Sequence, residues 1–234
     1  MTGAGAAQTR QIVHPDARDR GIKHPALAAF VHSVAAFALL AQANAAGSPL
    51  VQVDTELADA LHANVVPSAT TAFTAVTTLG STAVLALVAG TVAGYLVGRG
   101  RRGDAALLVV ALVGAQLLTW TLKAIFERPR PTFDDPVASA SWFSFPSGHA
   151  LSSIAVYGAL AYVLAGRARR TRARAAGLAG VALLVTAVGF SRLYLGVHYL
   201  TDVLAGYSAG LAWLLLAIGA LRGACHRRES VTSA

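Results

Sequence analysis

Apolar residues dominate this chain in six long stretches that are separated by shorter polar segments. They cover about residues 26–46, 71–98, 104–126, 149–166, 175–191 and 199–221. An α-helix rises 1.5 Å per residue, so about 20 apolar residues cross the hydrocarbon core of a bilayer. The pattern therefore predicts an all-α, polytopic membrane protein with six transmembrane helices in a bundle.

The polar ends of the chain mark the predicted boundaries of a single membrane domain. Residues 1–25 and 223–234 are predicted to be basic tails, and residues 26–222 a single six-span domain. The first apolar stretch also resembles a secretory signal peptide, since a basic lead precedes it and Ala41-Gln42-Ala43 imitates a cleavage site. We favour a retained helix, because the preceding tail is long and the remaining topology works with this segment in place.

The distribution of basic residues predicts the orientation of the bundle. Fifteen of the 19 Lys and Arg residues lie in the N-terminal tail, the 99–103 turn, the 167–174 turn or after the last stretch. In an alternating bundle these four places share one side, and the opposite 47–70 loop contains no Lys or Arg. Cytoplasmic loops carry the excess of basic residues, so both termini are predicted to be cytoplasmic.

The composition decides what this positive charge means. The net charge is +8, yet only 13% of residues are charged and 55% are hydrophobic, whereas about 25% of a soluble domain is charged. We therefore expect the membrane bilayer, and no nucleic acid, as the partner of the chain. The one cysteine, Cys225, cannot form an internal disulfide. Nothing in the sequence specifies an oligomeric state.

Two weaker patterns concern helix placement. In the 47–70 loop, Asp54 is expected to cap a short surface helix whose leucines at 57 and 61 face one way. Glycines four residues apart allow close approach of helix backbones. They occur in the second and sixth stretches, and we favour packing inside one bundle over a dimer face. These glycines are Gly90, Gly94, Gly98, Gly206 and Gly210.

Four basic residues lie on the side opposite to the others. They are Lys123, Arg128, Arg130 and Arg192. The polar segments 123–131, 146–149 and 191–202 are all predicted at this outer face, and polar residues at this depth indicate a functional site.

Each of these segments also has a structural explanation. Lys123 could extend from a helix end into the interface, and the prolines after it would end the helix. Ser147 could be an N-cap, and His198 with Asp202 a single hydrogen bond on a helix surface. Their coincidence on one membrane face favours a site.

Together, these residues suit phosphoryl transfer. Lys123, Arg130 and Arg192 can bind phosphate oxygens through charge-assisted hydrogen bonds. Free N–H groups at Ser147 and Gly148, where a helix begins, add an anion site.

The remaining polar residues supply the reacting groups. Asp202 lies one turn after His198, so it can accept the Nδ1 proton and leave Nε2 as a nucleophile. His149 then remains as an acid for the leaving oxygen.

In this order the residues resemble the signature of the type 2 phosphatidic acid phosphatase superfamily. That signature is a lysine, six residues and Arg-Pro; then Pro-Ser-Gly-His; then Ser-Arg, five residues, His, three residues and Asp. It occurs here without a departure, at Lys123 with Arg130-Pro131, at Pro146-Ser147-Gly148-His149, and at Ser191-Arg192 with His198 and Asp202.

The resemblance implies an integral membrane phosphatase that hydrolyses a lipid phosphate or a polyprenyl diphosphate without a metal or cofactor. By similarity, His198 is the nucleophile that forms a phosphohistidine, Asp202 orients it, and His149 acts as acid and then base. The phosphate-binding residues implied are Lys123, Arg130, Ser147, Gly148 and Arg192. Soluble vanadium haloperoxidases share this superfamily, but the six apolar stretches argue against that branch.

Several alternatives stay open at this point. The signature residues recognise the phosphate group and not the lipid attached to it. Phosphatidic acid, phosphatidylglycerol phosphate and undecaprenyl diphosphate are therefore all candidate substrates. An anion transporter would need polar residues through the whole bilayer, and an inactive structural protein would be expected to lack His149, His198 or Asp202. Asp134 and Asp135 are the one plausible metal pair, although a surface loop is favoured for them.

Overall fold

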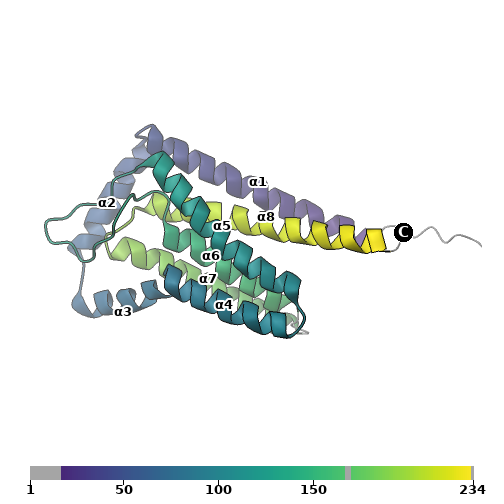
Figure 1. The fold of residues 1–234 in the computed structure, drawn as a ribbon. Helices are drawn as coiled ribbons and strands as arrows, with labels where there is room; N and C mark the ends of the chain where they lie inside the picture. The colour runs from purple at the N-terminus through teal and green to yellow at the C-terminus, as the bar shows by residue number, and fades with distance from the viewer. Residues whose placement is uncertain (1–16, 167–169, 233–234) are drawn as a thin grey trace, which may run out of the picture.

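The computed structural model describes residues 17–166 and 170–232, and these residues form eight helices and no strand. The helices are α1 (Ala17–Ala45), α2 (Pro49–Ala63), α3 (Pro67–Thr78), α4 (Thr82–Gly98), α5 (Arg102–Phe126), α6 (Gly148–Ala165), α7 (Thr171–Tyr194) and α8 (Leu200–Thr232). Five are long and apolar enough to cross a membrane, and α3 with α4 makes a sixth, broken span bent by 42°. The predicted all-α, six-span architecture is confirmed (Figure 1).

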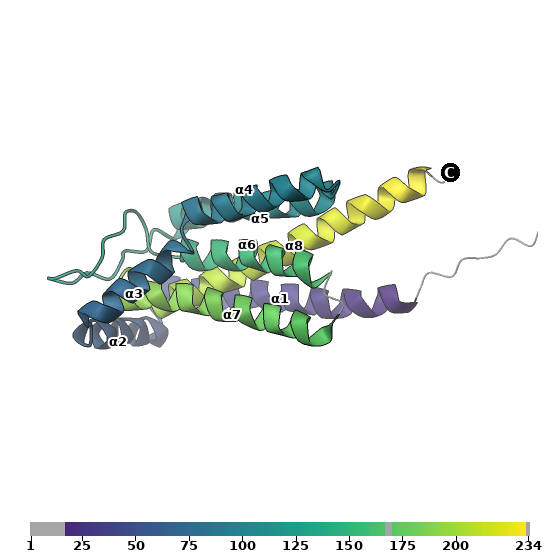
Figure 2. The same ribbon diagram turned by 90° about the horizontal axis from the view of Figure 1, so that it is seen from below.

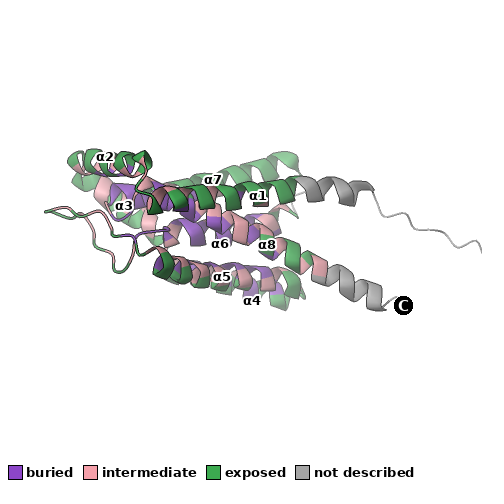
Figure 3. Cartoon of the chain, turned by 90° about the horizontal axis from the view of Figure 1, so that it is seen from above, coloured by how far each residue is buried: buried purple, intermediate pink, exposed green. Residues whose placement is uncertain are grey.

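The six spans run side by side, and different helix ends and loops lie at the two ends of the bundle (Figures 1 and 2). The helix α2, the start of α3 and the long α5–α6 loop lie at one end. The start of α1, the end of α8 and the α4–α5 turn lie at the other. Figure 3 shows α6 among its neighbours. In α6, 56% of the apolar span is buried, compared with 11% of the apolar span of α1. The exposed apolar faces of the outer helices are the surfaces that acyl chains would cover.

The first helix is longer than predicted and belongs to the bundle. It begins at Ala17, and α8 continues to Thr232, so helical structure extends past the predicted tail boundaries at 25 and 222. Phe37 and Ala41 of α1 pack against Phe145 and Ala205. This packing supports a retained first helix. Residues 1–16 and 167–169 lie outside the described chain, as do the side chains of 17–24 and 224–234, including that of Cys225.

The prediction for Asp54 is wrong. The outer helix α2 begins at Pro49 after Ser48, so Asp54 lies within the helix and not at its start. Its side chain is buried, because α2 packs against the bundle, where Leu61 contacts the cluster formed by Leu193 and Val203.

The second span breaks where it meets the centre of the bundle. A Cβ atom added at Gly80 would lie 2.4 Å from Val188 Cγ1 and 3.1 Å from His149 Cδ2, so only glycine allows this approach. Ser81 then starts α4, and its Oγ accepts a hydrogen bond from the Val84 N–H at 3.3 Å. The break leaves α3 free to turn across the end of the bundle.

The glycine patterns have different outcomes in the two helices. In α8, Cβ atoms at Gly206 and Gly210 would lie 2.6 Å from the Ser147 carbonyl and 2.5 Å from that of Leu151, so packing on α6 is confirmed. In α4 the same prediction is wrong. Cβ atoms at Gly90, Gly94 and Gly98 would meet nothing within 4 Å.

Candidate active site

The three signature segments meet at the end of the bundle that carries α2. Lys123 lies in the last turn of α5, His149 in the first turn of α6, and Arg192 in the last turn of α7. His198 precedes α8 and Asp202 lies in its first turn. The Ser147 N–H donates to the Asp202 carbonyl at 2.9 Å, so the predicted residues are brought together.

His198 and Asp202 form the predicted pair. His198 Nδ1 lies 3.3 Å from Asp202 Oδ2. The same carboxylate oxygen accepts from the Tyr199 N–H at 2.9 Å and from the Ser144 hydroxyl. Burial lowers the pKa of His198 to about 3, although the hydrogen bond and charge of Asp202 oppose this. The imidazole is therefore neutral at physiological pH, as a nucleophile must be.

Arg130 lies beside the free edge of this imidazole. Its Nη1 is 3.3 Å from His198 Nε2 and donates to the Val197 carbonyl at 2.6 Å. Its Nε and Nη2 donate to carbonyls of the α5–α6 loop at Trp142 and Ser141. Burial lowers the pKa of the guanidinium, and the charge of Asp202 opposes this. Backbone oxygens thus hold Arg130 at His198 without neutralising it.

The other two cations are held in the same way. Lys123 Nζ donates to the carbonyls of Phe143 and Ser144, the latter at 3.2 Å. Arg192 Nη1 donates to Thr77 Oγ1 of α3 at 2.8 Å, a contact that the bend between α3 and α4 makes possible. We call Lys123, Arg130 and Arg192 the cationic cradle.

The cationic cradle has unmet capacity to bind an anion. Within residues 17–166 and 170–232, none of its three members forms a salt bridge to a carboxylate. Arg192 Nε and Ser147 Oγ are buried without a hydrogen-bond partner. Buried cations and buried donors are costly unless they are paired. An anion with several oxygens, such as phosphate, would satisfy them together.

The start of α6 offers fewer backbone donors than predicted, because the Ser147 N–H is not free but donates to the Asp202 carbonyl. Gly148 begins the helix and packs against α5, where a Cβ atom would lie 2.9 Å from Thr119 Cγ2. The first N–H groups of a helix lack intrahelical partners and lie at the positive end of its dipole. His149 follows directly, so the acid predicted for the leaving oxygen lies beside these donors.

The prediction for the site omits a buried network around Arg128. Its guanidinium donates to Asp202 Oδ1 at 2.7 Å and to Asp54 Oδ2 at 2.9 Å. It also donates to Thr201 Oγ1 at 2.8 Å and lies 4.2 Å above the Tyr199 ring. Asp54 further accepts from the Thr201 N–H at 2.9 Å. We call Arg128, Asp54, Asp202 and Thr201 the Arg128 network. The only signal in the sequence is that Arg128 is one of the four basic residues on the outer side.

The two adjacent aspartates of the loop lie apart from this network. Asp135 Oδ1 bonds His62 Nε2 at 2.9 Å, and the Asp135 side chain is 91% exposed. In the described residues, no group of three or more His, Cys, Asp or Glu side chains is arranged to hold a metal ion. The nearby Phe145 is fully buried and packs against Phe37 and Phe126.

Known proteins are similar to this chain in both sequence and fold. Phosphatidylglycerophosphatase B of Bacillus subtilis is 36% identical over 183 residues, which cover 70% of this chain and 88% of that protein. Decaprenylphosphoryl-5-phosphoribose phosphatase of Mycolicibacterium smegmatis is 40% identical over 88 residues, or 36% of this chain and 42% of that protein.

Two crystal structures resemble the bundle. A transmembrane PAP2-type phosphatidylglycerolphosphate phosphatase from Bacillus subtilis superposes with a TM-score of 0.74 at 32% identity, covering 81% of this chain and 94% of that one. Aquifex aeolicus LpxE has a TM-score of 0.57 at 23% identity, covering 71% and 95%, which shows a shared fold. The family model of the PAP2 superfamily matches residues 104–223, which include every signature residue. The chain is a member of the PAP2 superfamily and a membrane lipid phosphatase.

Proposed function

We propose that this phosphatase transfers the phosphoryl group of its lipid to His198 and then to water. The observation that carries the proposal is the unneutralised cationic cradle beside His198, whose Nε2 lies 3.3 Å from Arg130. A phosphate held by Arg130 would lie next to a neutral imidazole. The cradle and the start of α6 would stabilise the charge that develops on the equatorial oxygens.

The first step breaks the bond between phosphorus and the lipid oxygen. Nε2 of His198 attacks phosphorus while the proton on Nδ1 stays hydrogen-bonded to Asp202, and protonated His149 gives its proton to the leaving lipid oxygen, which departs as the alcohol. In the second step a water molecule attacks the phosphohistidine while His149 takes one of its protons. Inorganic phosphate and the free histidine result. No metal is needed, because side-chain cations and helix N–H groups do the electrostatic work that Mg²⁺ does elsewhere.

The substrate we favour is phosphatidylglycerol phosphate. The support is the extent of similarity, since the phosphatidylglycerophosphatase of Bacillus subtilis matches over 88% of its length. A polyprenyl-linked phosphate is the second candidate, because a decaprenylphosphoryl-phosphoribose phosphatase matches over 42% of its length at 40% identity.

A phosphate-release panel separates these candidates. Purified protein in detergent would be given phosphatidylglycerol phosphate, phosphatidic acid, undecaprenyl diphosphate and decaprenylphosphoryl-5-phosphoribose, with His198→Ala as the blank. We expect the highest kcat/KM with phosphatidylglycerol phosphate. A higher value with either polyprenyl substrate would reverse the order, and no release from any of the four would refute the proposed activity.

We also propose that the active site faces away from the cytoplasm. The support is that Arg99, Arg101, Arg102 and the basic α7 start lie at the end opposite to the cationic cradle, as the positive-inside rule requires of the cytoplasmic side. In a Cys225→Ser background, cysteines at Ser141 or Asp134 should react with an impermeant thiol reagent outside intact cells. A cysteine at Arg170 should not react, and the reverse pattern would refute this orientation.

A further inference from the structure

A basic cavity lies at the end of the bundle opposite to the active site. It has a volume of about 540 Å³ and lies between α5, α6, α7 and α8. Arg101, Arg174 and Arg222 line it, together with one acidic residue, Asp104. Three guanidinium groups against one carboxylate leave an excess of two positive charges. None of these residues takes part in the proposed chemistry.

The arginines of this cavity are incompletely neutralised. Arg101 bonds Asp104 through Nη2, but its Nη1 is buried and has no hydrogen-bond partner among the described residues. The Arg222 guanidinium lies 5.1 Å above the Tyr162 ring, a cation–π contact that positions it without removing its charge. Within the described residues, Arg174 forms no salt bridge. Arg174 and Arg222 are exposed, yet both line the space between the helices together with Arg101.

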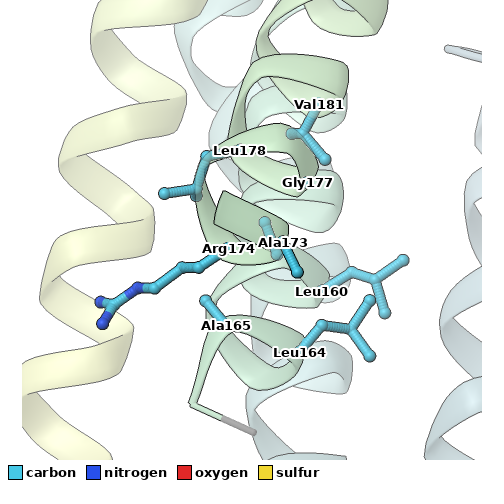
Figure 4. A pocket seen from close by; sticks show the side chains of 9 residues that line it. Leu160, Leu164, Ala165, Ala173, Arg174, Gly177, Leu178 and Val181 are labelled. Atoms are coloured by element: carbon cyan, nitrogen blue, oxygen red, sulfur yellow. The ribbon is translucent and has the colours of Figure 1, made fainter. Parts of the chain in front are cut away.

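An apolar groove adjoins the cavity and shares part of its wall. It lies between α6 and α7, has a volume of about 250 Å³, and is lined by Leu160, Leu164 and Val181. Leu178 and Arg174 line both the groove and the cavity. In Figure 4 the Arg174 side chain extends towards α8, away from Leu160 and Leu164. The groove and the cavity therefore adjoin at α7, with the charge of Arg174 on the cavity side.

We propose that the cavity and the groove together bind an anionic phospholipid of the leaflet at this end. The phosphate diester of the head group would lie among Arg101, Arg174 and Arg222, and an acyl chain would lie along the groove. Basic pockets between transmembrane helices bind anionic head groups, and the paired compartments match the two parts of such a lipid. Only 17% of the apolar span of α7 is buried by the protein. A lipid that contacts α6, α7 and α8 would therefore also stabilise the position of α7.

The head-group contact can be tested with Arg174→Gln combined with Arg222→Gln. Full-length protein in detergent would be titrated with phosphatidylglycerol or phosphatidylcholine and analysed by native mass spectrometry. Retention of phosphatidylglycerol should fall about tenfold or more, equivalent to about 1.4 kcal/mol. Retention of phosphatidylcholine should not change. The matched control is Arg172→Gln, an exposed arginine of the same helix that lines neither compartment.

The acyl-chain contact has its own pair of variants. A Cβ atom at Gly177 or at Gly180 would meet nothing within 4 Å, but only Gly177 lines the groove. Gly177→Leu should therefore weaken phosphatidylglycerol binding, and Gly180→Leu should not. Neither variant should change the binding of inorganic phosphate, which equilibrium dialysis would measure. If Gly177→Leu leaves phosphatidylglycerol binding unchanged, and if the protein binds inorganic phosphate tightly but loses it in Arg174→Gln with Arg222→Gln, the ligand is a free anion and the proposal is overturned.

A last variant distinguishes lipid bound in this cavity from lipid bound in the active site. Arg192→Gln alters the cationic cradle and leaves the cavity intact, so phosphatidylglycerol should be retained as in the unaltered protein. If Arg192→Gln removes the lipid while Arg174→Gln with Arg222→Gln keeps it, the bound lipid occupies the active site and the proposal is refuted. This outcome is independent of whether His198 forms a phosphohistidine.

Discussion

Two groups of cations lie at the same end of the bundle and differ in what surrounds them. Arg128 is held between the carboxylates of Asp54 and Asp202. The cationic cradle, within the described chain, contacts carbonyl and hydroxyl oxygens instead. Residues of one chemical type thus serve two purposes, since Arg128 completes the structure and the cradle still requires an anion. The neighbours of an arginine, more than its position in a motif, indicate whether it binds phosphate.

The largest effect is expected where the two groups meet, at His198. Its imidazole contacts Asp202 of the Arg128 network on one edge and Arg130 of the cradle on the other. His198→Ala should reduce kcat by at least about 10⁴-fold, because it removes the proposed nucleophile. Phosphate release and trapping of radiolabelled phosphoenzyme would measure this. Recovery of the label on another residue would contradict the assignment.

Changes in the cradle should affect catalysis far more than stability. Arg130→Gln or Arg192→Gln should lower kcat/KM by about 10²–10³-fold, as the loss of a preorganised charge contact does in other enzymes. The melting temperature in detergent should stay the same or rise, because repulsion among the three cations decreases. A fall in melting temperature comparable to that of an Arg128 variant would remove the distinction between the two groups.

Changes in the Arg128 network should show the opposite balance. Arg128→Gln leaves two carboxylates buried without a cation, and breaking a buried pair costs about 3–5 kcal/mol. The melting temperature should therefore fall markedly. Adding Asp54→Asn removes one of the stranded charges and should restore part of the loss, as thermal unfolding followed by fluorescence would show. A double variant no more stable than Arg128→Gln would argue against the pairing with Asp54.

The ionisation of His198 offers a subtler test, because both groups act on it. Its pKa is lowered to about 3, so its ring should remain neutral between pH 8 and 5, where an ordinary histidine with a pKa of about 6.5 becomes protonated. The ¹³Cε1 signal of His198, assigned by its loss in His198→Ala, should not shift over this range in NMR spectra of labelled protein. A midpoint near pH 6.5 would mean that water reaches the ring.

The smallest effect is expected from removal of divalent metals. If the cradle supplies the positive charge, activity should survive excess EDTA, and Asp134→Ala with Asp135→Ala should keep most of it. Asp135 is exposed and bonds His62, which places it in the surface of the loop. Loss of activity on chelation with recovery in Mg²⁺ would show that the cradle alone is insufficient, and the two aspartates would be the first residues to examine.

Much of this site could be predicted because its chemistry recurs at fixed spacing. Lys123, Arg130, His149, Arg192 and His198 follow one another along helices that alternate in direction, so the apolar pattern and the motif agree on one end of the bundle. Asp202 follows His198 by four residues, so the start of α8 brings the two side chains together although His198 itself precedes the helix. These are local or topological relations, and the sequence contains both kinds.

The Arg128 network could not be predicted because it depends on how α2 packs. An aspartate in an amphipathic outer segment has the same pattern whether it caps a helix, meets water or pairs with a distant arginine. Glycine spacing has a similar limit, since it identifies a face of α4 without showing that the face meets a neighbour. The break at Gly80 is missed when 71–98 is taken as one apolar stretch, although Thr77, Thr78, Ser81 and Thr82 interrupt the hydropathy there.

The position of Asp54 in the chain limits how this enzyme can be divided or recombined. The family match covers residues 104–223, so it includes Arg128 and leaves out the carboxylate that Arg128 bonds from α2. A chimera that takes only this segment would place Arg128 in a host that has to provide an acid at the same point. The smallest portable catalytic unit of this protein therefore begins before α2, well upstream of its first signature residue.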